Sequence, residues 1–264
     1  MSKNNILFIG TGKMATAIAA GMIAKGFAAS EISAFDISTE AAENFTKSSG
    51  VKVETQNLIT VLKQADTVIV AVKPQQIDKA LCEIKDKLII SIAAGIKIAK
   101  LQELTKAARI IRVMPNTPAT VGEGASAWCA SEQVNKDDIE LINKILSSIG
   151  TVCQVEEKLM DAVTGVSGSG PAYVLDFIIG LTKGGVKAGL PHDVAAELAA
   201  QTVFGTAKLL IESKRDPEIL RNEVTSPGGT TAEALAVLGE KDFKGTIIEA
   251  VIAATKRSIE LGNK

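Results

Sequence analysis

The sequence predicts two domains: an α/β, Rossmann-type domain built on a parallel sheet, followed by an all-α domain. Before Glu156, short apolar runs alternate with helical segments, which is typical of βαβ units. Beyond Glu156 only helical spacing is found, rich in small residues. We therefore expect an α/β domain over residues 1–156 and a helical domain over residues 157–264.

Six short runs are predicted to be strands. The run 6–9 is continuous and apolar and 67–72 is the clearest, as expected for strands buried on both faces of a sheet, whereas 51–53 is short and β-branched. The six runs cover residues 6–9, 32–35, 51–53, 67–72, 88–91 and 109–114. Helices are expected between them: one over residues 14–25 that ends at Gly26, and a second that Ser38 caps and that runs through residue 43. Because strands and helices alternate, the sheet should be parallel with helices on both faces.

The second half has helical spacing over residues 159–188, 194–212 and 246–261. We expect the run at 168–171, Gly-Ser-Gly-Pro, to kink or interrupt the first of these helices. The single histidine, His192, follows Gly-Leu-Pro and should be exposed in the first turn of the next helix. These helices carry many alanines and few bulky side chains, so they should pack against a second copy of the chain.

Composition excludes several function classes. The 264 residues include 29 Lys plus Arg and 30 Asp plus Glu, and a net charge of −1 gives no overall attraction to nucleic acid or acidic lipid. Only 3% of residues are aromatic, which argues against a stacking platform for bases. No uncharged apolar stretch reaches the ~18–20 residues that cross a bilayer, and the N-terminus lacks the pattern of a signal peptide. We expect a cytoplasmic protein.

Cysteine and histidine usage argues against disulfides and metals. Cys82, Cys129 and Cys153 are far apart and form no CxxC pair, so we expect reduced thiols in the core. One histidine cannot build a histidine metal cage, and we predict no metal.

A glycine-rich turn follows the first predicted strand and opens the first helix. Its pattern is G-x-G-x-x-A, in the run Gly10-Thr11-Gly12-Lys13-Met14-Ala15. The first glycine allows a tight turn, the second lets the backbone approach a pyrophosphate, and the alanine permits close packing of helix on strand. The N–H groups at the helix start then favour phosphate. The turn predicts a dinucleotide site; a packing turn without a ligand is the alternative.

Asp36 ends the second predicted strand, 24 residues beyond Gly12. A carboxylate here accepts hydrogen bonds from a ribose 2′-hydroxyl and repels a 2′-phosphate. No arginine follows it nearby, so the residues favour NADH over NADPH. The alternative is that Asp36 only caps the next helix.

Five later motifs, in this order, resemble the pyrroline-5-carboxylate reductase family. They are AVKPQ at 71–75, SIAAG at 91–95, RVMPNTP at 112–118, DAVTGVSGSGPAY at 161–173 and TSPGGTT at 225–231. The first three leave predicted strands at the sheet edge where ligands bind in open α/β folds. The resemblance covers essentially the whole chain, and the last motif is the most specific.

The resemblance implies a nucleotide-binding domain, a helical domain that interlocks with its twofold mate, and homodimers that are often assembled into rings. It also implies cofactor contacts at Gly10, Thr11, Gly12, Lys13, Met14, Asn57, Val72, Lys73, Pro74, Ala93 and Ala94. Members of the family usually prefer NADPH, and Asp36 departs from their pattern.

The implied reaction is reduction of 1-pyrroline-5-carboxylate to L-proline, the last step of proline synthesis, by hydride transfer from NADH or NADPH. A glycine turn that precedes a helical run can hold the carboxylate of this cyclic imine, with Ser226, Gly229 and Thr230 in it. The resemblance adds Thr231 as the catalytic residue, placed to hydrogen-bond the ring nitrogen, and Glu157 in the substrate pocket.

Two other functions compete with this one. The first is a β-hydroxyacid dehydrogenase, which uses a catalytic lysine in its helical half; Lys183 and Lys187 are present but their surroundings do not match. The second is a nucleotide sensor without catalysis. Such a protein would have no need of a second anion-binding turn, which the segment from Ser226 to Thr231 provides. For Glu157 the alternative is a solvated charge, and for the 168–171 run it is a kink needed only for packing.

Overall fold

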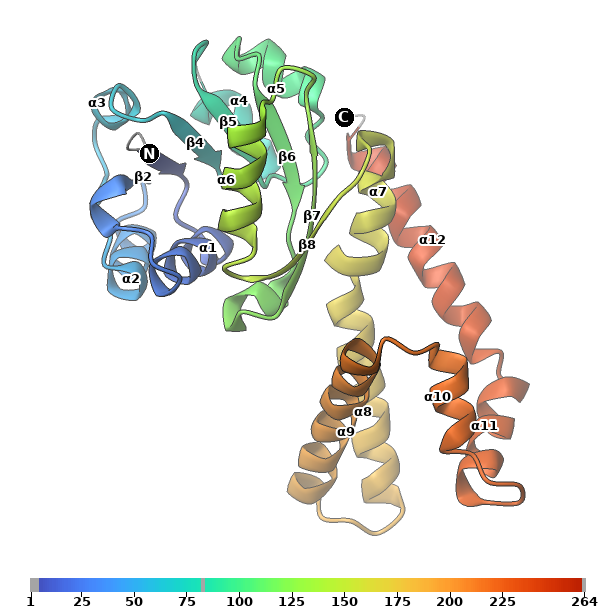
Figure 1. Ribbon diagram of the computed structural model, residues 1–264. Helices are drawn as coiled ribbons and strands as arrows, with labels where there is room; N and C mark the ends of the chain where they lie inside the picture. Colours follow the sequence, from blue (N-terminus) through green and yellow to red (C-terminus); the bar gives the residue numbers. More distant parts are fainter. Residues whose placement is uncertain (1–4, 82–83, 263–264) are drawn as a thin grey trace. The chain divides into compact units, whose positions relative to one another are not determined.

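The computed structural model describes residues 5–81 and 84–262 (Figure 1). The chain divides into two compact units: residues up to Ser169 together with those from Ala253 onward, and Gly170–Ile252. Each unit is described by itself. The functional boundary between residues 156 and 157 stays a prediction.

A sheet lies at the centre of the first unit, and within the described residues it has eight strands in the order β3-β2-β1-β4-β5-β6-β7-β8. All six predicted strands are present, and two further strands follow them. The strands are β1 (Ile6–Ile9), β2 (Ile32–Phe35), β3 (Val53–Glu54), β4 (Thr67–Val70), β5 (Leu88–Ser91), β6 (Ile110–Met114), β7 (Gly124–Ala130) and β8 (Gly150–Gln154).

The sheet is parallel except where β7 runs antiparallel to β6. The predicted parallel sheet is confirmed for the other strand pairs, and the antiparallel pairing of β7 with β6 is the exception. Sequence patterning missed β7 because Gly-Ala-Ser-Ala lacks the Val and Ile of the other strands, although Trp128 in it is among the largest buried side chains. The strand β8 was missed because it is an edge strand whose residues are mostly exposed or half-buried.

Helices cover both faces of the sheet, as predicted (Figure 1). In β1, Ile6 and Phe8 pack into one core cluster, whereas Leu7 and Ile9 pack into the other. The first cluster takes residues from α1 (Lys13–Ala24), α2 (Thr39–Ser49) and α6 (Lys136–Leu146). The second takes residues from α3 (Leu58–Leu62), α4 (Ile77–Ala80) and α5 (Ile98–Thr105).

The start of α2 confirms one local prediction and extends another. Ser38 is its N-cap, and the Ser38 hydroxyl accepts a hydrogen bond from the N–H of Ala41 at 3.3 Å. The helix runs beyond residue 43 to Ser49 and ends at Gly50, where φ is +73°. Glycine tolerates this left-handed conformation without steric cost, so it ends the helix.

The two cysteines among the described residues differ in burial. Cys129 on β7 is buried, as expected, but Cys153 is exposed because it lies on the edge strand β8. The expectation that both pack in the core was therefore wrong for Cys153. Cys82 lies outside the described residues.

The first unit also contains a rare helical turn. The 3₁₀ turn Glu157–Leu159 leads into α7 (Met160–Val163), and a π-helical turn, Thr164–Gly168, follows. The predicted interruption at 168–171 is confirmed, since the π turn ends at Gly168 and α8 (Gly170–Lys187) begins two residues later. The C-terminal end of α12 (Phe243–Gly262) joins this unit, where the Ser258 hydroxyl donates to Asp161 Oδ1 at 2.6 Å.

The second unit is helical, with α8, α9 (His192–Ser213), α10 (Pro217–Glu223), α11 (Thr230–Glu240) and most of α12. His192 is exposed in the first turn of α9, as predicted. Only Thr182, Ala195 and Ala199 are fully buried between Gly170 and Ile252. The prediction that these helices lack a sufficient core of their own is confirmed.

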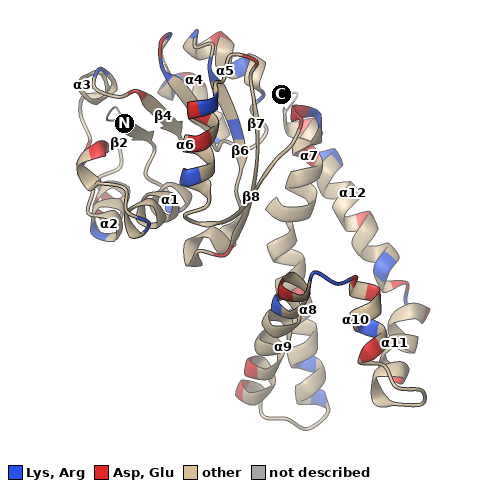
Figure 2. Cartoon of the chain, viewed as in Figure 1, with Lys and Arg blue, Asp and Glu red and all other residues tan. Residues whose placement is uncertain are grey.

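Large apolar side chains of these helices are exposed in the single chain. They include Leu175, Phe177, Ile179, Leu198, Phe204, Ile248 and Ile252. Figure 2 shows that α8 and α9 carry few charged residues. Two helical stretches of the described chain, Glu157–Lys187 and His192–Ser213, have the length and hydropathy that would suffice to cross a membrane. Exposed apolar area of this extent marks an interaction surface.

Candidate dinucleotide and substrate sites

The turn after β1 has the geometry of a phosphate-binding loop. Gly10 has φ of +96°, and a Cβ atom there would lie 2.8 Å from the backbone of Ala71, so no larger residue fits. Gly12 is the N-cap of α1 and has open space around it, which leaves the backbone accessible. Ala15 is buried against the sheet. Each small residue therefore has the role that the motif predicts.

The first helix begins without a capping side chain or an acidic residue in its first turn. Its leading N–H groups are therefore available to an anion, and Lys13 adds an exposed positive charge. A groove of about 610 Å³ extends from here between α1 and α2. It is lined by residues that include Thr11, Gly12, Lys13, Ser38, Glu40 and Asn44.

Asp36 lies at the end of β2, but its carboxylate is turned toward the glycine turn. Asp36 Oδ2 accepts hydrogen bonds from the Thr11 N–H at 2.7 Å and from the Thr11 hydroxyl at 2.9 Å. Asp36 Oδ1 accepts one from the Ser38 N–H at 2.9 Å. The alternative that Asp36 only caps the next helix is wrong, because Ser38 is the N-cap of α2 and Asp36 holds the turn after β1. A carboxylate has about four acceptor positions, so one remains on Oδ1 for a ribose hydroxyl.

Asn57 follows β3 and is exposed as the N-cap of α3, where its Oδ1 accepts from the Thr60 N–H at 3.3 Å. The N–H groups of Gln56 and Asn57 donate to Glu54 Oε1 at 2.8 and 3.1 Å and lower the pKa of the Glu54 carboxyl. This network fixes the loop after β3, which leaves the sheet at the same edge as the ends of β1 and β2.

The ends of β4 and β5 bring the other predicted cofactor residues to this edge. Val72 and Pro74 are half-buried, Lys73 is exposed, and a Cβ at Gly10 would touch Val72 at 3.0 Å. After β5, Ala93 is buried and Ala94 is exposed. β1 and β4 are neighbours in the sheet. From β1 the strand order continues through β2 to β3, and from β4 it continues through β5 toward the opposite edge of the sheet. The carboxyl ends of β1 and β4 therefore form the switch point at which open α/β sheets bind ligands.

Glu157 has partners inside the first unit. Its Oε1 accepts a hydrogen bond from the Ile98 N–H, the first residue of α5, at 2.8 Å and lies 3.4 Å from Arg112 Nη1. Burial raises the pKa of the neighbouring Cys129 thiol to about 11; the negative charge of Glu157 adds to this, and Arg112 opposes it. Glu157 is therefore not a freely solvated charge.

The proposed substrate segment is a glycine turn in the second unit. Gly228 has φ of +66°, the Gly229 N–H donates to the Ser226 carbonyl at 3.0 Å, and Gly229 is the N-cap of α11. A Cβ at Gly229 would lie 2.3 Å from Ser226 Oγ and 3.1 Å from the Ser226 carbonyl oxygen, so a larger residue here would displace the Ser226 hydroxyl. No side chain caps α11, so N–H groups of its first turn, which includes Thr230 and Thr231, are available to an anion.

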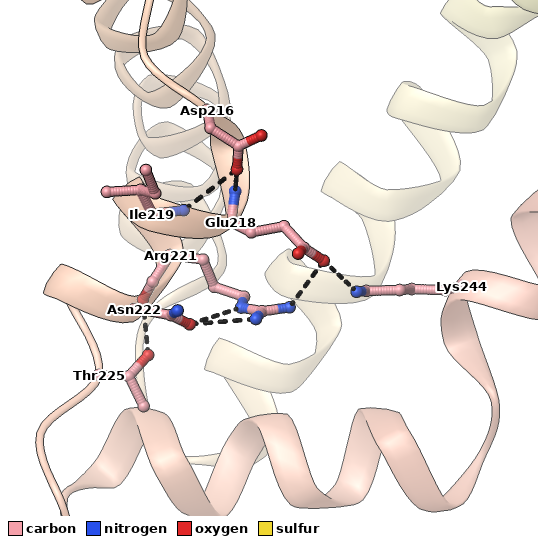
Figure 3. A network of polar contacts seen from close by, with 7 residues as sticks. All are labelled: Asp216, Glu218, Ile219, Arg221, Asn222, Thr225 and Lys244. Carbon is pink, nitrogen blue, oxygen red and sulfur yellow. Dashed lines mark hydrogen bonds and ion pairs between the residues drawn. The ribbon is translucent and has the colours of Figure 1, made fainter.

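The segment that leads into this turn is held by a polar network (Figure 3). The Asp216 carboxylate caps α10 by accepting from the N–H groups of Glu218 and Ile219. Glu218 in turn pairs with Lys244 at the start of α12, at 3.2 Å. Beyond the end of α10 at Glu223, the Thr225 hydroxyl donates to the Arg221 carbonyl at 2.7 Å, one residue before Ser226.

Sequence reasoning did not give a role to Arg112 or Asn116. Arg112 is buried on β6 and pairs with Glu157. Asn116 Oδ1 accepts from the Ala125 N–H at 2.9 Å, and Asn116 Nδ2 donates to the Ser167 carbonyl in the π turn at 3.1 Å. A charged residue inside the apolar run 110–113 was the available signal, because arginine is rarely buried without a partner.

Comparison with known proteins agrees with this arrangement. Residues 157–261 match the family model described as pyrroline-5-carboxylate reductase dimerisation, and residues 5–95 match that of the coenzyme F420-dependent NADP oxidoreductases. The pyrroline-5-carboxylate reductase of Synechocystis is 45% identical, with 97% of each chain covered. That of Arabidopsis thaliana is 43% identical over 96% of this chain and 94% of its own.

Solved structures give the same result. A pyrroline-5-carboxylate reductase from Coxiella burnetii superposes with a TM-score of 0.91 at 37% identity, covering 98% of this chain and 99% of its own. A Plasmodium falciparum pyrroline carboxylate reductase with NADP bound gives 0.87 at 34% identity, covering 99% of both chains. Because sequence and fold agree over nearly the full length, the chain belongs to the pyrroline-5-carboxylate reductase family.

Proposed function

We propose that the chain reduces 1-pyrroline-5-carboxylate to L-proline with NADH or NADPH. In this proposal, the residues named above bind the cofactor, bind the substrate and relay a proton. The observation that carries this proposal is full-length similarity to reductases of this name, combined with an intact turn at Ser226–Thr231. The reaction needs an electrophilic C=N carbon, a hydride donor about 3–3.5 Å from it, and a proton on the ring nitrogen.

The dinucleotide, when bound, supplies the hydride. The residues at the sheet edge fit such a group, because Gly10 leaves no room for a side chain and the start of α1 has uncapped N–H groups. In our proposal the turn 10–14 binds the pyrophosphate, Asp36 accepts from the adenosine ribose, and Asn57 together with the loops 72–74 and 93–94 orients the remainder.

The turn before α11 binds the substrate carboxylate in this proposal. Uncapped N–H groups and the hydroxyls of Ser226 and Thr230 supply donors without an arginine. The Thr231 hydroxyl hydrogen-bonds the ring nitrogen. Because the pKa of a threonine hydroxyl lies far above neutrality, Thr231 orients the imine and relays a proton that comes from water. Within the described residues, the side-chain hydrogen bonds of Glu157 are made by Oε1. We propose that the other oxygen, Oε2, contacts the substrate.

The charge of Asp36 favours NADH in our proposal. The structure keeps this carboxylate at the end of β2, half-buried and bonded to Thr11 and Ser38. Those donors reduce its negative potential but leave its net charge. A 2′-phosphate placed beside it would be repelled, and Lys13 is the nearest cation on the turn.

The exposed apolar helices are proposed to contact a second copy of this chain. The family model over residues 157–261 is described as a dimerisation domain, which supports burial by protein and not by lipid. Assembly of dimers into a ring, cytoplasmic location and the domain boundary at 156 are further parts of the proposal.

A spectrophotometric assay tests the proposed reaction. Purified protein is mixed with 1-pyrroline-5-carboxylate and NADH or NADPH, and cofactor oxidation at 340 nm is compared with proline formation. We expect one proline for each cofactor oxidised. Oxidation of 3-hydroxyisobutyrate without reduction of the imine would instead indicate a β-hydroxyacid dehydrogenase, and cofactor binding without any turnover would indicate a sensor.

A further inference from the structure

The loop that follows β5 is held in place by residues far away in the sequence. It covers residues 92–97, carries Ala93 and Ala94 at the cofactor edge of the sheet, and leads into α5 at Ile98. The side chain of Lys97, the N-cap of α5, makes no capping hydrogen bond to the helix, and no acidic residue stands in the first turn of α5. The local sequence therefore leaves the start of this helix without the usual stabilising group.

Glu157 supplies the missing cap from 59 residues away. Its Oε1 accepts the Ile98 N–H at 2.8 Å, where the partial positive charge of the helix start favours a carboxylate. Arg112 Nη1 lies 3.4 Å from the same oxygen. The Arg112 side chain is 5% exposed and that of Glu157 is 36% exposed, so the pair is partly shielded from water and fixes where the carboxylate lies.

A second contact holds the loop from another side. Gly95 has φ of +79°, and its carbonyl oxygen would lie 2.9 Å from a Cβ atom at Gly262. The last residue described in α12 is thus packed directly on the loop. Both contacts come from the part of the chain that follows the Rossmann sheet, so the loop conformation depends on that part.

We propose that Glu157 is a positioning residue for the cofactor, which acts through the Ile98 N–H to hold the 92–97 loop in its binding conformation. This inference rests on the proposed function, in which Ala93 and Ala94 contact the dinucleotide. It differs from the substrate contact proposed for Glu157 above, because it predicts an effect on cofactor binding when no imine is present.

Calorimetric titration with NADH and NADPH, without substrate, tests the inference. Glu157→Ala removes both the cap and the partner of Arg112, and the fraction of molecules with a competent loop falls. The Kd for the preferred cofactor should rise by about tenfold, since the apparent Kd scales inversely with that fraction. Glu157→Gln keeps an acceptor for Ile98 and should raise Kd by less than about threefold.

Glu156→Ala is the matched control, because it removes the neighbouring carboxylate. The contact described for the Glu156 side chain is an ion pair with the exposed Lys158 at 2.6 Å. This variant should leave Kd unchanged. Melting temperatures are recorded for all variants, and titrations are done well below them. A purely structural role of Glu157 would lower the melting temperature and leave the Kd of the folded protein unchanged.

Two results would overturn the inference. The first is a wild-type Kd in Glu157→Ala. The second is a raised KM for the imine at saturating cofactor with no change in cofactor Kd, which would assign Glu157 to the substrate alone. If the wild type bound neither cofactor, the proposed function itself would fail, and the inference with it.

Discussion

Exchange of the residues at the end of β2 should reverse the cofactor preference. In our proposal, the wild-type Asp36 carboxylate lies where a 2′-phosphate would approach. Ile37 beside it is 80% exposed. Two unit charges 4 Å apart repel by about 4 kcal/mol at an effective dielectric of 20, and by about 1 kcal/mol in water. Asp36 is half-buried and accepts three hydrogen bonds, so a value near the lower end applies.

We take about 1.4 kcal/mol, which corresponds to a tenfold advantage of NADH over NADPH in kcat/KM. The double variant Asp36→Ser, Ile37→Arg removes the charge and adds a guanidinium that can bind phosphate through two parallel hydrogen bonds. Because Ile37 is exposed, the arginine displaces nothing from the core. The variant should prefer NADPH, although its absolute efficiency falls with both cofactors because Thr11 loses its acceptor.

The assay is a side-by-side titration of both cofactors at saturating imine. Thr11→Val is the control, since it removes the hydroxyl bond to Asp36 and keeps the charge; it should weaken both cofactors and leave their ratio unchanged. A wild type that prefers NADPH would refute the reasoning. It would mean that the bonds to Thr11 and Ser38 turn the carboxylate away from the ribose, or that Lys13 binds the phosphate.

Three further predictions concern other parts of the chain. Thr231→Val should lower kcat/KM by roughly 100–1000-fold with little change in cofactor Kd, because one preorganised donor is lost in the transition state; near-normal turnover would remove Thr231 from the mechanism. Sedimentation should find a dimer and no stable active monomer, since Gly170–Ile252 buries only three residues fully. The pKa of the Cys129 thiol is raised from 9.0 to about 11 in the folded protein. Between these two pH values the folded state keeps the thiol proton, whereas the unfolded state loses it. The free energy of unfolding should therefore fall as pH rises from 9 to 11, and Cys129→Ala should lack this part of the slope in denaturant titrations.

The fold could be predicted where one physical rule decides the structure. Strands buried on both faces need apolar residues, and the runs 6–9 and 67–72 give the fully buried strands β1 and β4. The β-branched run 51–53 overlaps the half-buried β3 only at Val53. The turn needs glycine at Gly10, because a Cβ atom there would lie 2.8 Å from the backbone of Ala71, the residue that follows β4. The strands β7 and β8 could not be predicted in this way, since one contains small residues and the other lies at an edge.

The site residues could be predicted only in part. Motif spacing indicated that the loops after β1, β4 and β5 share an edge, and parallel strands place them there. It could not show that Asp36 bonds to Thr11, or that Glu157 caps α5 across 59 residues, because such pairings depend on tertiary contacts and not on local pattern.

Transfer of an isotopic label tests the central claim most directly. The purified protein is incubated with 1-pyrroline-5-carboxylate and a reduced cofactor that carries deuterium at the nicotinamide position from which hydride is transferred. The product is analysed by mass spectrometry and NMR. The account predicts L-proline with one deuterium on the carbon of the former C=N bond, and roughly 100–1000-fold slower formation of that product by Thr231→Val. Cofactor oxidation that leaves the deuterium out of proline would contradict it.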